Sequence, residues 1–211
     1  MDDDVRVNKT LTLTLMSEVS QPKRRRADAE RSVSAILDAA VEVLADRPEA
    51  SMEQIAKAAS VARQTVYAHY ASRDELLDAV MQRALDETVE AIDSARIDDG
   101  TPAEALERLV TASWRTLERY PLLMDLRSPL TAAEEHALHA PILERLDRLI
   151  RRGRRSGDFD RRLPPAWLLA SFLGLAHAAA QEVRAGRLSA EDASRSLRRT
   201  VARAFGVGQP A

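Results

Sequence analysis

The segment SMEQIAKAASVARQTVYAHYASRDEL, residues 51–76, decides how this 211-residue chain folds. Two short helical patterns, at 51–58 and 62–68, are separated by only three residues, from Ala59 to Val61. Two short helices joined by such a tight break are typical of a helix-turn-helix. The sequence therefore predicts a helix-turn-helix whose second helix exposes the residues of its first turns.

The exposed side chains of that second helix are suited to reading DNA. The N-terminal residues of a recognition helix reach base edges in the major groove, where arginine pairs with guanine and glutamine with adenine. Hydroxyl groups, and a basic side chain at a helix start, suit phosphates. The candidate DNA contacts are Arg63, Gln64, Thr65, Tyr67, His69 and Arg73. The alternative is an ordinary solvated helix face.

These residues resemble the DNA-binding segment of TetR-type transcriptional regulators. The matching motif is Ile55-Ala56-x-x-Ala59-x-Val61-x-x-x-Thr65-Val66-Tyr67-x-His69-Tyr70-x-Ser72-x-Asp74-x-Leu76. The family usually has glycine in the turn, where this chain has Ser60, so this turn lacks the conformational freedom of glycine. It often has serine or threonine where this chain has Ala62, which cannot cap the second helix by its side chain.

The resemblance implies an all-α homodimer that binds a palindromic DNA operator, acts as a repressor and is released by a small hydrophobic ligand. It also implies an N-terminal three-helix bundle and a linking helix at 72–95 that leads to a larger helical ligand-binding and dimerisation domain. Ligand binding would shift the spacing of the two recognition helices. Only one spacing would match half-sites about 34–36 Å apart, or a multiple of that distance.

The rest of the chain supports an all-α fold with three regions. Helix starts with capping-box patterns recur at Ser51, Ser72, Thr101, Thr131 and Ser189. We expect a disordered N-terminal extension at 1–26 with a basic arm at 23–26, a helix-turn-helix domain at 27–71 and a helical ligand-binding and dimerisation domain at 72–211. One hypothesis is that residues 1–15 precede the natural start at Met16.

The C-terminal region offers candidates for a ligand pocket and a dimer interface. Large or polar residues among its apolar stripes could line a pocket or could be plain core; they are Trp114, Tyr120, Met124, Trp167, Phe172 and His177. The helix that starts after Pro164 is apolar almost all round, so one of its neighbours is expected to be a second subunit. The expected interface residues are Leu168, Phe172, Leu175, Ala179, Leu197 and Val201, the alternative being a core within one chain.

Composition excludes several classes of protein. The 31 basic and 33 acidic residues nearly cancel, which argues against a diffuse polycation but leaves room for a local basic patch. The absence of cysteine removes disulfides, thiolate metal sites and cysteine nucleophiles. No Gly-rich phosphate loop or nucleophile elbow is present, and His136 and His139 lack a third ligand, so we expect no enzyme activity, cofactor or metal.

Two other functions stay open from the sequence. One is a constitutive DNA-binding dimer without a ligand, and the other is a helical small-molecule-binding protein or enzyme with a vestigial N-terminal module. No stretch has the length and apolarity of a membrane span, and the N-terminus lacks the pattern of a secretion signal. The sequence therefore predicts a cytoplasmic protein without a membrane partner.

Overall fold

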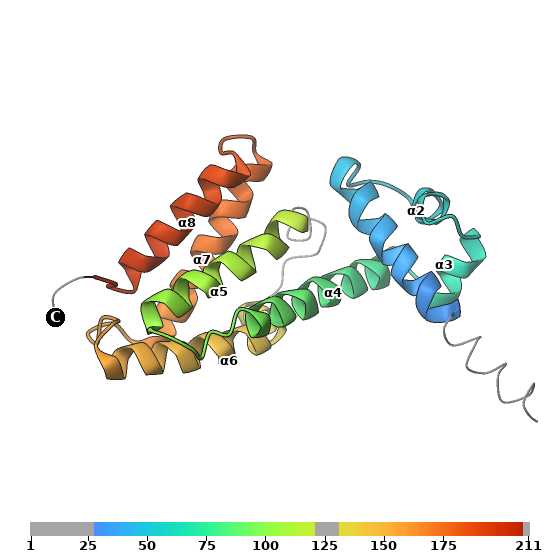
Figure 1. Ribbon diagram of the computed structural model, residues 1–211. Helices are drawn as coiled ribbons and strands as arrows, with labels where there is room; N and C mark the ends of the chain where they lie inside the picture. Colours follow the sequence, from blue (N-terminus) through green and yellow to red (C-terminus); the bar gives the residue numbers. More distant parts are fainter. Residues whose placement is uncertain (1–27, 121–130, 209–211) are drawn as a thin grey trace, which may run out of the picture. The chain divides into compact units, whose positions relative to one another are not determined.

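The computed structural model describes residues 28–120 and 131–208, and every regular element in these two stretches is a helix, as predicted (Figure 1). The chain divides into two compact units, residues 1–76 and 77–211. The division falls inside α4 (Arg73–Ser94), so one continuous helix takes part in both units. Within the described residues, none of the helices combines the length and the apolarity needed to cross a membrane.

The smaller unit consists of a first helix at 28–46, α2 (Met52–Ala58), α3 (Arg63–His69) and the first turn of α4. The apolar stripe of the first helix lies in the core, where Ile36 is fully buried. Ile55 of α2, Val66 of α3 and Leu76 at the start of α4 are also fully buried. The amphipathic pattern of each short helix is thus satisfied within this unit.

The predicted helix starts are confirmed by their caps. Ser51, Thr101 and Thr131 each form a complete capping box, in which side chain and backbone of the two partner residues exchange hydrogen bonds. The hydroxyls of Ser72 and Ser189 accept hydrogen bonds from the third backbone amide of their helices. These contacts fix where each helix begins, independently of the packing that follows.

The larger unit is built around α5 (Pro102–Arg119). Its apolar face, which includes Leu106 and Leu109, is buried against α6 (Ala132–Ser156), α7 (Pro165–Arg184) and α8 (Ala190–Ala204). Figure 1 shows α5 in yellow-green among these helices, with α7 and α8 side by side. This arrangement gives α7 a buried side toward the chain and a side that faces outward.

Arginine side chains hold the turn that joins α4 to α5. The guanidinium of Arg108 donates to three backbone carbonyls between residues 95 and 99, at 2.6 to 3.1 Å. Arg152 of α6 donates to two more carbonyls of the same turn, one of them Ile97 at 2.9 Å. Arg145 forms a two-pronged ion pair with Asp93 at 2.6 and 2.7 Å, and this contact lowers the pKa of the Asp93 carboxyl. The end of α4 is therefore fixed by α5 and α6 through directional hydrogen bonds.

One glycine of α6 is required by packing. A Cβ at Gly153 would overlap the ring of Phe159, which lies against the helix backbone there. The same ring meets Phe205 edge-on at 5.4 Å between centroids. The helix runs through Gly153 and ends at Ser156, with Gly157 in the left-handed conformation as its C-cap.

The expected dimer-interface residues divide into a buried and a partly exposed group within the single chain. Leu168, Phe172, Leu197 and Val201 are buried inside a single chain, because α5, α6 and α8 cover that side of α7. These four side chains contribute to the core of the single chain, and their part in a dimer interface stays a prediction. Of the six expected residues, only Leu175 and Ala179 are partly exposed.

The outward side of α7 is a separate apolar surface. Trp167 is 60% exposed there, although tryptophan is usually well buried. Ala170, Gly174 and Ala178 follow at helical spacing and are exposed as well. We call these four residues the α7 face. It was not distinguished from the buried side in the sequence, because both sides of the helix are apolar.

Candidate functional site

The first candidate site is the helix-turn-helix formed by α2 and α3. Ser51 caps α2, and the turn closes with hydrogen bonds from the amides of Ser60 and Val61 to carbonyls of α2. Ser60 adopts φ of 56°, in the left-handed region that favours glycine. Ala62 precedes α3 and forms no side-chain cap, as its side chain predicts. The turn is therefore formed without glycine and at some cost in backbone strain.

The start of α3 presents a polar face to solvent. Arg63 and Gln64 are exposed, and the Tyr67 ring is 41% exposed, while Val66 on the opposite side is buried. The Arg63 guanidinium lies 5.3 Å from the centre of the Tyr67 ring and 3.7 Å from a carboxylate oxygen of Glu53 on α2. These contacts hold the Arg63 side chain near the first turn of α3, where a recognition helix meets base edges.

The other three predicted DNA contacts are less exposed. Thr65 and His69 are half-buried, and the His69 ring lies 6.3 Å from that of Tyr70, between centroids. The half-buried Arg73 side chain donates to the backbone carbonyl of Pro48, so it connects α4 to the turn that follows the first helix. The structure thus brings Arg63, Gln64 and Tyr67 to one exposed face and gives Arg73 a structural contact.

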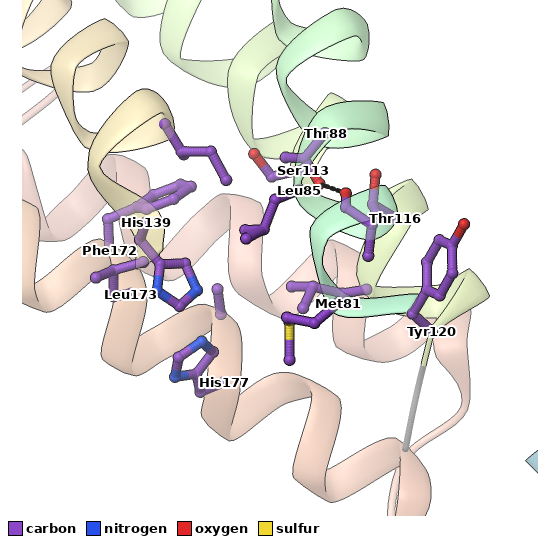
Figure 2. A pocket seen from close by; sticks show the side chains of 14 residues that line it. Met81, Leu85, Thr88, Ser113, Thr116, Tyr120, His139, Phe172, Leu173 and His177 are labelled. Atoms are coloured by element: carbon purple, nitrogen blue, oxygen red, sulfur yellow. Dashed lines mark hydrogen bonds between the residues drawn. The ribbon is translucent and has the colours of Figure 1, made fainter. Parts of the chain in front are cut away.

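The second candidate site is a cavity of about 70 Å³ in the larger unit (Figure 2). Successive turns of α4, from Met81 to Thr88, form one side of the cavity, and α5, α6 and α7 form the rest of its wall. The lining residues are Met81, Ala84, Leu85, Thr88, Ser113, Thr116, Leu117, Tyr120, His139, Ile142, Phe172, Leu173, Ala176 and His177. Most of this surface is apolar, with a few polar groups, as is typical of small-molecule sites.

The wall carries polar side chains at both ends of the cavity and between them. The imidazoles of His139 and His177 lie 5.6 Å apart between ring centroids, and Figure 2 shows them together at one end. Tyr120 lies at the opposite end in the same view, and burial raises its pKa to about 12, with a smaller contribution from Glu87. Thr88 donates its hydroxyl proton to the carbonyl of Ala84 at 2.7 Å.

Three of the six residues expected in a ligand pocket line this cavity: Tyr120, Phe172 and His177. Trp114 is buried in the core outside the lining, and Trp167 lies on the α7 face. Met124 lies outside the described residues. Whether any of the six contacts a ligand stays a prediction.

Sequence reasoning missed His139, Ser113 and the contribution of α4. A signal for His139 was present, since the buried stripe of α6 through Ile142 and Leu146 extends back by one turn to this histidine. The spacing of three residues pairs His139 with His136 in the sequence, but His136 is exposed while His139 is buried. Among the described residues, no three His, Cys, Asp or Glu side chains come together as a metal site would require.

Comparison with known proteins identifies relatives of the whole arrangement. Residues 36–80, which span the helix-turn-helix, match the family described as bacterial regulatory proteins, tetR family. The HTH-type transcriptional repressor LfrR of Mycolicibacterium smegmatis is 31% identical over 168 residues, which are 80% of this chain and 87% of LfrR. The HTH-type transcriptional regulator NfxB of Pseudomonas aeruginosa is 26% identical over 170 residues, 80% of this chain and 89% of NfxB.

Solved structures agree with these sequence matches. A crystal structure of LfrR in complex with proflavine has a TM-score of 0.62 at 26% identity and covers 86% of this chain and 98% of that one. FadR of Bacillus subtilis in complex with stearoyl-CoA has a TM-score of 0.68, over 80% of this chain and 97% of FadR. At 19% identity the latter shows a shared fold only.

The strained turn gives a first prediction. Ser60→Gly should slow amide hydrogen exchange of residues 55–66, because glycine adopts the left-handed conformation without steric cost; we expect a gain of about 0.5–1 kcal/mol in local stability. Ser196→Gly in the exposed middle of α8 is the matched control and should lose about 1 kcal/mol in its own helix. Faster exchange in α2 and α3 of Ser60→Gly would contradict the assigned turn.

The raised pKa of Tyr120 gives a second prediction. An unfolded chain ionises tyrosine near pH 10, whereas the folded chain keeps the Tyr120 proton until about pH 12, so the free energy of unfolding should fall as the pH rises between these values. Denaturant unfolding at several alkaline pH values measures this slope. Tyr120→Phe should show a shallower fall, and an unchanged slope in this variant would mean that Tyr120 ionises at its ordinary pH.

Proposed function

Because the chain belongs to the tetR family of bacterial regulatory proteins, we propose that it is a ligand-responsive transcriptional repressor that binds a palindromic operator as a homodimer. A small molecule that enters the cavity lined by α4 to α7 would release the protein from DNA. The single observation that carries this proposal is the exposed Arg63, Gln64 and Tyr67 face of α3 within a family-matched helix-turn-helix. Its place of action would be the bacterial cytoplasm, where the operator lies, and its role would be regulatory rather than enzymatic.

The known relatives support the direction of regulation and the use of a ligand. LfrR is named as a repressor, and its structure contains proflavine. In this chain, Met81, Leu85 and Thr88 bring α4 directly into the cavity wall. The same helix begins at Arg73, and only three residues separate it from the end of α3 at His69.

That continuity suggests how ligand binding would reach the DNA-binding residues. A molecule larger than the cavity must displace part of its wall, and the α4 side chains belong to that wall. The far end of α4 is held by Arg108, Arg145 and Arg152, so it resists displacement. The ligand would then favour a second position of α4 and change the population of DNA-binding conformations. A constitutive DNA-binding dimer would lack this response.

The homodimer would form through the α7 face. Trp167 supplies a large apolar side chain, and Ala170, Gly174 and Ala178 permit close helix approach. A Cβ at Gly174 would meet no atom within 4 Å in the single chain, so space for a partner is open there. Two copies of this face would give a symmetric, self-complementary interface.

The DNA-binding proposal predicts the effect of changing Arg63. Operator DNA is first obtained by footprinting the region upstream of the gene or by selection from random duplexes. Arg63→Ala should then weaken operator binding about 5- to 150-fold, because a bidentate arginine–guanine contact contributes about 1–3 kcal/mol. If Arg63 contacts a phosphate instead, the slope of log affinity against log salt should fall by about one.

Arg199→Ala is the matched control, since Arg199 is an exposed arginine of α8 in the other unit. It should bind the operator as the wild type does. Equal operator binding by Arg63→Ala and Arg199→Ala would refute the assigned recognition face. If the wild type protects no DNA at modest salt, the proposal that the protein is a DNA-binding regulator is wrong.

The dimer proposal predicts the effect of charge on the α7 face. The double variant Ala170→Arg/Ala178→Arg should raise the dimer dissociation constant at least ~100-fold, since two uncompensated charges per subunit would be buried. Sedimentation velocity measures the oligomeric state. Glu107→Arg on the exposed side of α5 serves as the control and should stay dimeric. A dimeric double variant would place the interface elsewhere.

A further inference from the structure

Two buried hydroxyl groups belong to the wall of the cavity, one on α4 and one on α5. Thr88 and Ser113 both line the cavity, and each residue is only 7% exposed. Buried hydroxyl groups in proteins are nearly always hydrogen-bonded. The bonds that these two oxygens form, and those they leave open, therefore indicate which polar group of a ligand the cavity can hold.

Ser113 offers a hydrogen-bond donor. A hydroxyl side chain within a helix often donates to the carbonyl four residues earlier, as Thr111 of the same helix does to Glu107 at 2.8 Å. The Ser113 hydroxyl oxygen, in contrast, has no hydrogen-bond partner among the described residues. A buried polar group in this state destabilises the chain, and a ligand atom that accepts the Ser113 proton would remove that cost.

Thr88 offers an acceptor and no donor. Its hydroxyl donates to the carbonyl of Ala84 at 2.7 Å, and this bond uses the only hydrogen of the group. The oxygen keeps lone pairs that can accept a hydrogen bond from a ligand. In this cavity Ser113 can therefore donate a hydrogen bond to a ligand, whereas Thr88 can only accept one.

Contacts between α4 and α5 bring the two hydroxyl groups to the same stretch of the cavity. Arg108 of α5 donates to the carbonyl of Ala95, the residue after α4, at 2.9 Å. Further along α5, Arg119 forms an ion pair with Glu87 of α4 at 3.2 Å. The serine lies between these two contacts on α5, and the threonine lies between them on α4. Figure 2 shows both side chains in the same part of the wall, so one small polar group can reach both.

We propose that the effector is an apolar molecule ending in a group that both accepts and donates a hydrogen bond, such as a hydroxyl or a primary carboxamide. The acceptor of this group receives the Ser113 proton, and its donor binds the Thr88 oxygen. This inference rests on the proposed function and deepens it, because it names the class of ligand that the cavity takes.

Such a ligand joins α4 to α5. Thr88 belongs to α4, the helix whose displacement is proposed to release DNA, and Ser113 belongs to α5, around which the larger unit is built. Leu85, Ile142 and Phe172 contribute apolar surface to the same wall and can cover an aromatic or short aliphatic body. Two directional bonds and the apolar body together would thus set the position of α4 in the ligand-bound chain.

Three probes of nearly equal size separate the role of the donor from that of the acceptor. Benzyl alcohol has a donor and an acceptor, anisole has an acceptor only, and ethylbenzene has neither. Binding is followed by NMR on the full-length chain, labelled with ¹³C at the methionine methyl groups, because Met81 lies in the cavity wall. The Met81 signal is assigned by its loss in Met81→Leu.

Ser113→Ala removes the donor of the wall, and Thr88→Val removes the acceptor with little change in shape. Each variant should weaken benzyl alcohol binding about 2- to 10-fold, the factor that corresponds to one hydrogen bond. Anisole should be weakened by Ser113→Ala alone, and ethylbenzene by neither variant.

Thr111→Val is the matched control for Thr88→Val, because Thr111 forms the same bond to the carbonyl four residues earlier but does not line this cavity. Ser196→Ala, on the exposed side of α8, is the matched control for Ser113→Ala. Both control variants should bind all three probes as the wild type does.

The chain without ligand gives an independent test of the state of Ser113. Ser113→Ala should leave the melting temperature unchanged or raise it, because it removes a buried hydroxyl group that has no partner. A clear fall in the melting temperature would mean that this hydroxyl is already hydrogen-bonded in the folded chain, and the proposal would be wrong.

Four binding results would also overturn the proposal: unchanged binding of benzyl alcohol in either variant, equal weakening of all three probes, weakening of anisole by Thr88→Val as large as that by Ser113→Ala, or no response of Met81 to any probe. Operator binding by the wild type, measured without probe, keeps the two proposals apart. If the operator is bound but the probe pattern fails, only the ligand class is wrong. If no operator is bound, the proposed regulatory function is wrong.

Discussion

The larger unit depends on the burial of one face of α5. Leu106, Leu109 and Trp114 leave water only if α6, α7 and α8 pack around that helix, and each fully buried leucine contributes about 1.5–3 kcal/mol. The candidate ligand cavity is a consequence of the same packing, because Ser113 projects from this face at a point where the neighbouring helices do not close completely. The core of the larger unit and the wall of this cavity thus share one helix.

The two candidate sites place different demands on the backbone. The recognition helix is only seven residues long, and it lacks a side-chain cap, so its position depends on Val66 in the core and on the turn at Ser60. The cavity instead depends on long helices whose ends are fixed, as the arginine contacts around residues 95–99 fix α4. A regulator needs both properties: a recognition helix positioned by a small core, and a cavity for a ligand within a stable helical unit.

Short-range sequence patterns predicted most of the helices, but only the structure showed which side of each helix is buried. Capping residues such as Ser51 and Thr101 act within one turn, and so their helix starts could be read directly from neighbouring residues. The buried and exposed sides of α7 could not be told apart in this way, because the helix is apolar on both sides and periodicity does not distinguish an inner apolar face from an outer one. The lining of the cavity was even harder to predict from the sequence, because His139 and His177 come together only when α6 and α7 pack against each other.

The contact between Gly153 and Phe159 has a consequence for recognising further relatives of this chain. A side chain at 153 and a full phenyl ring at 159 exclude each other, since the first β-carbon would overlap the ring. The residues at these two positions therefore constrain each other. A homologue with alanine or a larger residue at the position of Gly153 must carry a smaller residue than phenylalanine at the position of Phe159, or its α6 must end in a different conformation. The two positions can therefore be used to test whether a relative closes α6 onto Phe205 in the same way.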